Sequence, residues 1–510
     1  MTDGARGWTR RAAALAAGLI SVASLIWASG APLALGVRVW AEQVLIAALC
    51  LSMALVFLER SRRREARAPE AAPWPDRLLA LAAAAYGGFL VWRFPYLSEN
   101  LFYAREEALW TASIGLALLL EAVRRALGWP LIAILGAVCG YALFADRFPG
   151  ALMSRAISPE RLVRFTILDS ASMAGAALSV AVIVVVPYVI LARLLARSGG
   201  SAFFSDLAVA LLGRMQGGSG KIAILASALF GSISGSAVAN VASTGAVTIP
   251  LMARGGYRPR TAAAIEAVAS TDGQLMPPIM GASAFLLAEN LQVGYGTVIV
   301  AALVPALLYY VSLFIVADLE AARAGILPVE GERPGAGALL RRGWFILAPF
   351  AALVVLLFGL NLRPETAALG ALALLFLISL LVTYEGPRLG PRDIREALTD
   401  GGRSAVEVIL ICALAGIVIG VVNLSGLSFG LTFFLVELGE TSLAALLALT
   451  ALLCVLLGMG LPTVGVYLLL ATLAAPPLVR LGLDPMAAHL FVLYFGMLSM
   501  ITPPVAIAAF

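Results

Sequence analysis

Long apolar runs separated by short polar loops follow one another along most of this chain. Runs of about 20 apolar residues are long enough to cross a hydrocarbon core of about 30 Å. They predict membrane-spanning helices at residues 12–33, 38–59, 76–92, 108–126, 129–146, 176–197, 261–289, 296–317, 344–362, 367–383, 404–423 and 485–510. Strands of a membrane β-barrel give only alternating segments of about ten residues. The chain is therefore expected to be an all-α polytopic membrane protein.

Two further apolar segments are interrupted by small or helix-breaking residues. The first, 222–250, contains Gly-Ser-Ile-Ser-Gly-Ser, and the second, 446–472, contains Gly-Met-Gly-Leu-Pro-Thr. Each is followed by a Pro-Pro pair, and Pro503-Pro504 repeats Pro277-Pro278 at a shift of 226 residues. Paired, interrupted hydrophobic segments in two halves of a chain indicate the binding site of a secondary transporter.

The positions of the basic residues predict how these segments enter the membrane. Arginine-rich loops favour the cytoplasm, which places the N-terminus and the run Arg62-Arg63-Arg64 inside. Basic residues flank both ends of the first interrupted segment, so it is expected to enter and return as a helical hairpin on the cytoplasmic side. An odd number of predicted crossings separates it from the second segment. We therefore expect the second hairpin to enter from the outer side, as an inverted repeat.

The composition of the chain limits the classes of function that it can have. The chain is 61% hydrophobic and only 13% charged, which is typical of an integral membrane protein. Its net charge of +5 comes from arginines in short loops, so it indicates membrane topology rather than a nucleic-acid partner. The sequence contains neither a phosphate-binding P-loop nor residues at metal-ligand spacing, and this predicts no nucleotide partner and no enzymatic activity. The four cysteines lie in apolar spans and are interpreted as small buried hydrophobes.

The repeat defines the expected domain organisation. Residues 1–146 have no counterpart in it and form a separate N-terminal transmembrane module, joined by a linker at 147–175 to a permease at 176–510. Repeat 1 covers about 176–317 and repeat 2 about 404–510. Short amphipathic segments at 201–215 and 427–441 occupy matching positions and are expected to be interfacial helices. Repeat 2 has no counterpart of the span at 296–317, so it is expected to be truncated at Phe510.

The interruptions bring together groups that bind ions. Helix N-termini at a hairpin tip attract an anionic group, while hydroxyls and unwound carbonyls suit a dehydrated cation such as Na⁺. Pro277-Pro278 lacks two backbone donors and is expected to free carbonyls near Gly273 and Gln274. Asp272 lies at the same break. It is expected either to cap the following half-helix or to bind a cation or proton.

The motifs at Phe230–Asn240, Gly273–Pro278, Gly458–Thr463 and Phe495–Pro504 resemble those of the large membrane subunit of tripartite ATP-independent periplasmic (TRAP) transporters, over roughly 165–510. The leading spans are similar to the small membrane subunit, fused in front, and such fused permeases resemble those that work with TAXI-type periplasmic substrate-binding proteins. The resemblance implies an elevator-type permease in a bacterial or archaeal inner membrane. It also implies Na⁺-coupled uptake of a small organic acid that the binding protein delivers.

The same resemblance implies the site residues. One Na⁺ site would use Ser236, Asn240, Gly273, Met276 and Pro278, and the other Gly458, Thr463, Ser499, Thr502 and Pro504. The substrate would lie between the hairpin tips, near Ser234, Ser236, Thr463 and Thr502. No organic cofactor is implied.

One residue departs from the family pattern. Asp272 stands where the family more often has a small uncharged residue, which leaves H⁺ coupling open beside Na⁺ coupling. A stand-alone elevator-type anion symporter without a receptor is the main alternative, and the fused N-terminal module argues against it. A passive channel or a non-transporting scaffold subunit is less compatible with two opposed hairpins around one site.

Overall fold

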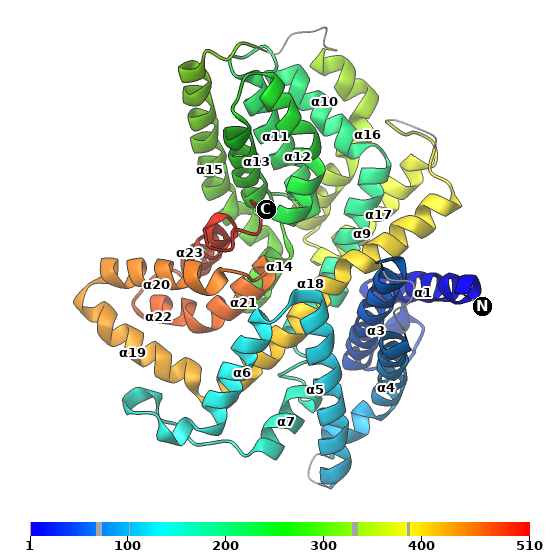
Figure 1. Cartoon of the computed structure of the whole chain (residues 1–510), viewed down its shortest axis with the longest axis vertical. Helices are drawn as coiled ribbons and strands as arrows, with labels where there is room; N and C mark the ends of the chain where they lie inside the picture. The colour runs from blue at the N-terminus through cyan, green and yellow to red at the C-terminus, as the bar shows by residue number, and fades with distance from the viewer. Residues whose placement is uncertain (1, 68–73, 101–102, 329–334, 385–387, 510) are drawn as a thin grey trace. The chain divides into compact units, whose positions relative to one another are not determined.

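The computed structural model describes residues 2–67, 74–100, 103–328, 335–384 and 388–509. Every regular element of these residues is a helix (Figure 1). Seven of the described helices are long and apolar enough to cross a membrane, which agrees with the polytopic all-α fold predicted from the sequence. Phe510, where a truncated repeat was predicted, lies outside the described residues.

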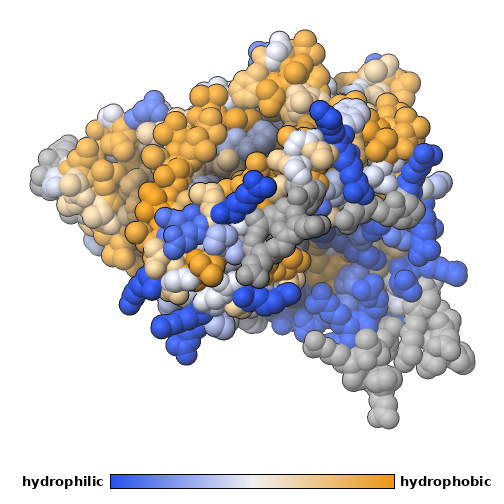
Figure 2. All heavy atoms as spheres, turned by 90° about the horizontal axis from the view of Figure 1, so that it is seen from above, coloured by the Kyte–Doolittle hydropathy of each residue, from blue (hydrophilic) through white to orange (hydrophobic). Residues whose placement is uncertain are grey.

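The exposed side chains are those of a protein surrounded by lipid. Figure 2 shows hydrophobic residues over broad areas of the visible face. On α15 (Tyr295–Ala324), exposed apolar residues recur at helical spacing: Val300, Val304, Leu308, Val311 and Ile315. A stripe of this kind on a long helix is expected where the solvent is hydrocarbon rather than water.

The chain forms two compact units. Unit 1 contains 1–190, 395–450 and 464–492, and unit 2 contains 191–394, 451–463 and 493–510. These units cut across the predicted domains, because segments distant in sequence share one core. In unit 1, for example, α18 (Pro391–Ser425) approaches α1 (Thr2–Ala28) so closely that a Cβ on Gly402 would meet the Ala17 carbonyl.

Unit 1 holds the helices of the predicted N-terminal module: α3 (Ala41–Arg67), α4 (Trp74–Glu99), α5 (Arg105–Leu127) and α6 (Pro130–Leu143), together with α1. The buried Asp76 of α4 is paired with Arg125 of α5. The segment predicted as a linker contains a further helix, α7 (Pro159–Leu168), which packs on α5. Its amphipathic sequence is too short and too polar to have been recognised as a span.

Unit 2 is built around the first hairpin. α11 (Gly218–Ser234) and α12 (Ala237–Arg254) pack against each other and against α13 (Pro259–Gly273), and α11, α13 and α15 share a hydrophobic core. Residues 274–281 are non-helical, and α14 (Ala282–Leu291) follows. The predicted crossing at 261–289 is therefore a broken helix, interrupted at its Pro-Pro pair.

The second repeat follows the order of the first. After α19 (Leu427–Thr441) come α20 (Leu443–Gly458), α21 (Thr463–Leu473), α22 (Ala475–Arg480) and α23 (Pro485–Leu498). α13 and α23 begin at equivalent prolines, Pro259 and Pro485. The predicted crossing at 485–510 is wrong in its second half. Helical structure ends with the 3₁₀ turn Ser499–Ile501, and turns follow, because Pro503-Pro504 has no backbone donors to continue the helix.

Candidate functional site

The tip of the first hairpin is a two-residue break between α11 and α12. Gly235 has a left-handed backbone with φ of 62°, and a Cβ there would lie 3.2 Å from the Gly281 Cα. Both features favour glycine. Ser236 then caps α12, its hydroxyl accepting from the Ala239 amide at 3.4 Å, while the Ser234 hydroxyl donates to the Ser236 carbonyl at 3.4 Å. The predicted tip serines thus lie together, with Ser236 exposed.

Behind this tip, α11 crosses the broken helix α13 at two glycines. A Cβ on Gly231 would lie 2.6 Å from the Gly273 Cα and 2.6 Å from Asn240 Nδ2. Asn240 is fully buried and donates to the Ser227 carbonyl at 2.9 Å. The structure therefore brings together Asn240 and Gly273 of the first predicted cation site, beside Gly231.

The same crossing recurs in the second repeat. A Cβ on Gly458 at the end of α20 would lie 2.5 Å from the Ser499 hydroxyl oxygen. Ser499 donates to the Gly496 carbonyl at 2.6 Å, and Thr502 donates to the Leu498 carbonyl at 2.6 Å. Ser499 is the residue that the repeat shift places on Gly273. Two members of the second predicted cation site, Gly458 and Ser499, are thus in contact.

The two crossings belong to the same unit. Ala237, beside the first tip, packs in one cluster with Met500 and Ala508 of the second break. Ser236 and Thr502 are next in the chain to members of this cluster or to residues packed against it.

The remaining predicted site residues offer fewer binding groups to the predicted sites. The side chain of Met276 is partly buried against the core of α11, α13 and α15. Thr463 begins α21 and is 8% exposed. Pro278 is half-buried in the turn after the break, and Pro504 is exposed.

The carbonyls predicted to be free at the first break have local donors. The Gly273 carbonyl accepts from the Met276 amide at 3.2 Å, and the Gln274 carbonyl accepts from the Gly281 amide at 2.5 Å. Each carbonyl oxygen retains a second lone pair, so both remain able to ligate a cation.

A buried hydroxyl cage lies next to the first site, and the sequence reasoning missed it. Glu266 is fully buried, and four hydroxyls donate to its carboxylate. They are Ser227 at 2.7 Å, Thr244 at 2.5 Å, Thr248 at 2.6 Å and Ser270 at 2.9 Å. The Thr244 hydroxyl oxygen also lies 2.8 Å from the Asn240 carbonyl oxygen, an alternative acceptor for its single proton, so the cage adjoins the predicted cation site. The spacing of four residues between Thr244 and Thr248 on α12 was the sequence feature from which this cage could have been predicted.

Asp272 has no such partners. It is 1% exposed, and neither carboxylate oxygen has a hydrogen-bond partner among the described residues. The side chain therefore caps no helix terminus, and the capping interpretation is wrong.

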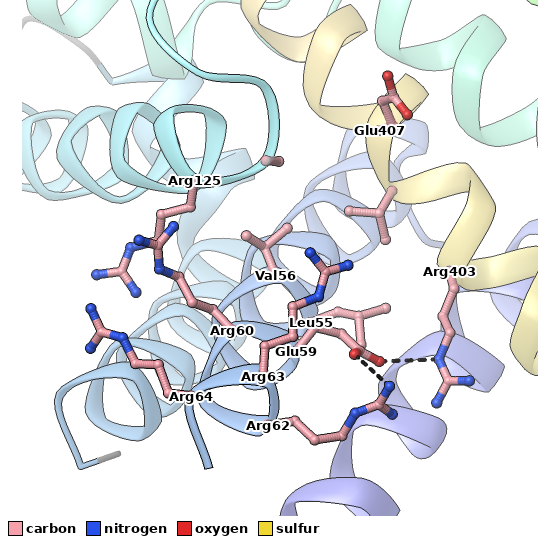
Figure 3. A pocket seen from close by; sticks show the side chains of 12 residues that line it. Leu55, Val56, Glu59, Arg60, Arg62, Arg63, Arg64, Arg125, Arg403 and Glu407 are labelled. Atoms are coloured by element: carbon pink, nitrogen blue, oxygen red, sulfur yellow. Dashed lines mark ion pairs between the residues drawn. The ribbon is translucent and has the colours of Figure 1, made fainter. Parts of the chain in front are cut away.

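A separate pocket of about 720 Å³ lies in unit 1, between α3, α5 and α18 (Figure 3). Its charged lining is mainly arginine: Arg60, Arg62, Arg63, Arg64, Arg125 and Arg403. Glu59 is paired with Arg62 at 3.2 Å and with Arg403 at 3.3 Å. None of the predicted site residues lines this pocket, so we treat it as distinct from the transport site.

Comparison with known proteins identifies relatives of the region that contains both crossings. The family model of the tripartite ATP-independent periplasmic transporter, DctM component, matches residues 114–510. The C4-dicarboxylate TRAP transporter large permease protein DctM of Pseudomonas aeruginosa is 27% identical over 328 residues, covering 64% of this chain and 75% of that protein. The sialic acid TRAP transporter large permease protein SiaM of Vibrio cholerae is 24% identical over 328 residues, with the same coverage.

A third relative is the isethionate TRAP transporter permease protein DctMQ of Oleidesulfovibrio alaskensis. It is 25% identical over 337 residues, which cover 64% of this chain and 51% of that protein. All three relatives are transporter permeases rather than enzymes.

Proposed function

Because the chain belongs to the family of the DctM component of TRAP transporters, we propose that it is a Na⁺-coupled permease for a small organic acid. A periplasmic substrate-binding protein of the TAXI type would deliver the solute. The relatives carry names that specify a C4-dicarboxylate, sialic acid and isethionate, all of which are organic anions. We assign this chain to a bacterial inner membrane, with a cytoplasmic N-terminus.

The observation that carries this proposal is the repeated crossing. Gly231 meets Gly273 and Gly458 meets Ser499, both in unit 2. Each crossing surrounds carbonyls and hydroxyls with protein and leaves an interrupted helix facing a hairpin tip. Oxygen ligands of this kind suit a hard cation, and the helix N-terminus at Ala237 suits the carboxylate or sulfonate of a substrate.

The N-terminal helices support a fused architecture. The family match begins at residue 114, so α1, α3 and α4 precede it. We assign residues 1–146 to a small-subunit-like scaffold, against which the hairpins and broken helices move in an elevator cycle.

The test measures cation binding without requiring a known solute. Purified protein is heated in NaCl, KCl or choline chloride at equal ionic strength. Binding of Na⁺ to the folded state raises the apparent Tm selectively in NaCl, and the rise grows with concentration. Equal Tm values in all three salts would refute the cation sites.

Two variants assign the effect to the proposed residues. Asn240→Ala and Thr502→Ala are each expected to reduce the Na⁺-dependent Tm rise and the Na⁺ dependence of uptake, while membrane insertion is retained. Unchanged Na⁺ dependence in both variants would contradict the assignment. For uptake, the labelled solute is the one retained by the copurifying binding protein, and both an imposed Na⁺ gradient and that protein are expected to be required.

A further inference from the structure

The arginine pocket between α3, α5 and α18 lies where helices of unit 1 reach their charged ends (Figure 3). The apolar span on α3 ends at Arg64, and Arg125 lies in the last turn of α5. Two exposed tryptophans flank these ends, because Trp74 begins α4 and Trp129 follows α5. Tryptophan rings are enriched at the level of lipid headgroups. The pocket therefore lies at headgroup depth.

The positive charge of the pocket is only partly balanced. Six of its twelve lining residues are arginines and two are glutamates. Three carboxylates at the pocket are each shared between two arginines: Asp76 by Arg64 and Arg125, Glu121 by Arg124 and Arg125, and Glu59 by Arg62 and Arg403. Figure 3 shows Arg62 and Arg403 meeting at Glu59. Shared carboxylates cannot neutralise every arginine, so the pocket keeps an excess of positive charge.

Arg60 and Arg63 carry unpaired charge in this pocket. Neither makes an ion pair with a residue that the structure describes, and Arg60 is half-buried while Arg63 is exposed. Three residues apart on α3, they lie on one face of the helix. A cleft lined by one sign of charge raises the local concentration of the opposite ion. The planar guanidinium group binds two phosphate oxygens at once, so these arginines suit a phosphate group.

The remaining lining residues are apolar, and they favour a lipid over a soluble phosphate. Leu55 and Val406 are buried, and Val56 is half-buried. The volume of about 720 Å³ is typical of a site for a small molecule, for which about 300–1,000 Å³ is usual. An inorganic phosphate has no apolar part to contact these side chains. The glycerol and acyl carbons of a phospholipid do.

We propose that this pocket binds the headgroup of an anionic phospholipid from the inner leaflet, with Arg60 and Arg63 contacting its phosphate. Under the proposed topology the arginine-rich end of α3 is cytoplasmic, and basic pockets between spanning helices on that side bind anionic headgroups. Because α3 and α5 belong to the predicted N-terminal module and α18 to the permease, the lipid joins the two. This inference goes beyond the proposed function, since it requires neither Na⁺ nor a solute.

The first experiment identifies the ligand. The purified full chain, delipidated in a neutral detergent, is titrated with phosphatidylglycerol, phosphatidylcholine or inorganic phosphate, and the apparent Tm is measured. A ligand of the folded state raises the Tm as its concentration increases. We expect a rise with phosphatidylglycerol alone. No rise with this lipid, or an equal rise with phosphatidylcholine, which has no net charge, would overturn the proposal. An equal rise with inorganic phosphate would indicate a site for a soluble anion and would overturn it as well.

The second experiment assigns the effect to the pocket. The double variant Arg60→Gln/Arg63→Gln removes two guanidinium groups without breaking an ion pair of the described residues. The matched control is Arg258→Gln/Arg260→Gln, which removes two exposed arginines of unit 2. Each basic residue near an anionic lipid contributes about fivefold to its binding. The phosphatidylglycerol concentration at half the Tm rise should therefore increase about 25-fold in the Arg60/Arg63 variant and stay unchanged in the control. Equal values in the two variants would overturn the assignment.

A single substitution covers the case in which the double variant does not fold. Arg63→Gln changes an exposed side chain and is expected to weaken phosphatidylglycerol binding about fivefold. Mass spectrometry of the purified proteins gives a second readout. The parent and the Arg258/Arg260 control should retain more anionic phospholipid per chain than Arg63→Gln. If Arg63→Gln binds and retains this lipid as the parent does, the proposal is wrong.

Discussion

At the scale of single residues, the buried hydroxyl cage is the feature with the clearest energetic consequence. Thr248 is the sole described donor to Oε2 of Glu266, whereas Oε1 has three. The cage joins α11, α12 and α13, so it holds the first hairpin against the broken helix. Buried acceptors left without a donor are more costly than the hydrogen bond itself is favourable.

Replacing Thr248 by valine tests the cage. Thr248→Val keeps the side-chain shape and leaves Oε2 unsatisfied, and we expect a loss of about 1–3 kcal/mol. The measurement is the apparent Tm of the purified protein. Thr271→Val is the matched control, because the Thr271 hydroxyl only adds a bond to the Ala267 carbonyl. Equal Tm shifts in the two variants would argue against a special role for the cage.

At the scale of elements, the two crossings are equivalent contacts with different residues. The first repeat uses Gly231 against Gly273, and the second uses Gly458 against Ser499. Ser499 has a side chain at the position of Gly273, so Gly458 is the residue that must lack one. The contact between hairpin and broken helix is therefore present in both repeats, although different residues form it.

The element-scale prediction is a rescue. Gly458→Ala places a methyl group 2.5 Å from the Ser499 hydroxyl oxygen and 2.8 Å from its Cβ. Such overpacking is expected to cost about 1–3 kcal/mol and to impair uptake. Adding Ser499→Gly removes both clashing atoms, so the double variant should recover stability beyond Gly458→Ala alone, as measured by apparent Tm. If the double variant recovers no stability, the clash at the crossing is not the cause of the stability loss in Gly458→Ala.

At the scale of the whole molecule, the charge pattern predicts that the repeats enter the membrane from opposite faces. The repeat shift places Arg254, in the last turn of α12, on Arg480, in the last turn of α22, and both are exposed. Only Arg254 has further basic residues close to it in the sequence, which is typical of a cytoplasmic loop.

Cysteine labelling checks this topology. In cells with an intact inner membrane, a membrane-impermeant maleimide should label Arg480→Cys from the periplasm and should label Arg254→Cys only after permeabilisation. The parent is the control, because its cysteines are buried or half-buried: Cys50, Cys139, Cys412 and Cys454. Labelling of both variants from the same side would exclude the inverted repeat.

The sequence by itself determined the membrane-spanning helices, the two interruptions and their repeat, because apolar run length and Gly, Ser and Pro act locally on the backbone. Its motifs also singled out Asn240, Gly273, Gly458 and Ser499, which the structure places at the two crossings. The spacing of hydrophobic residues does not show which path the chain takes after Pro503-Pro504, and the span predicted there was wrong.

Only the tertiary structure decided which buried polar groups have partners. Glu266 and Asp272 are both acidic residues in one apolar helix, and nothing in their local sequence tells which of them has hydrogen-bond donors. The hydroxyls that satisfy Glu266 come from α11 and α12 as well as from α13, and no donor among the described residues reaches Asp272. Hydrogen bonding between helices depends on how they cross, and the crossings are set by close contacts at Gly231 and Gly458 that no single segment specifies.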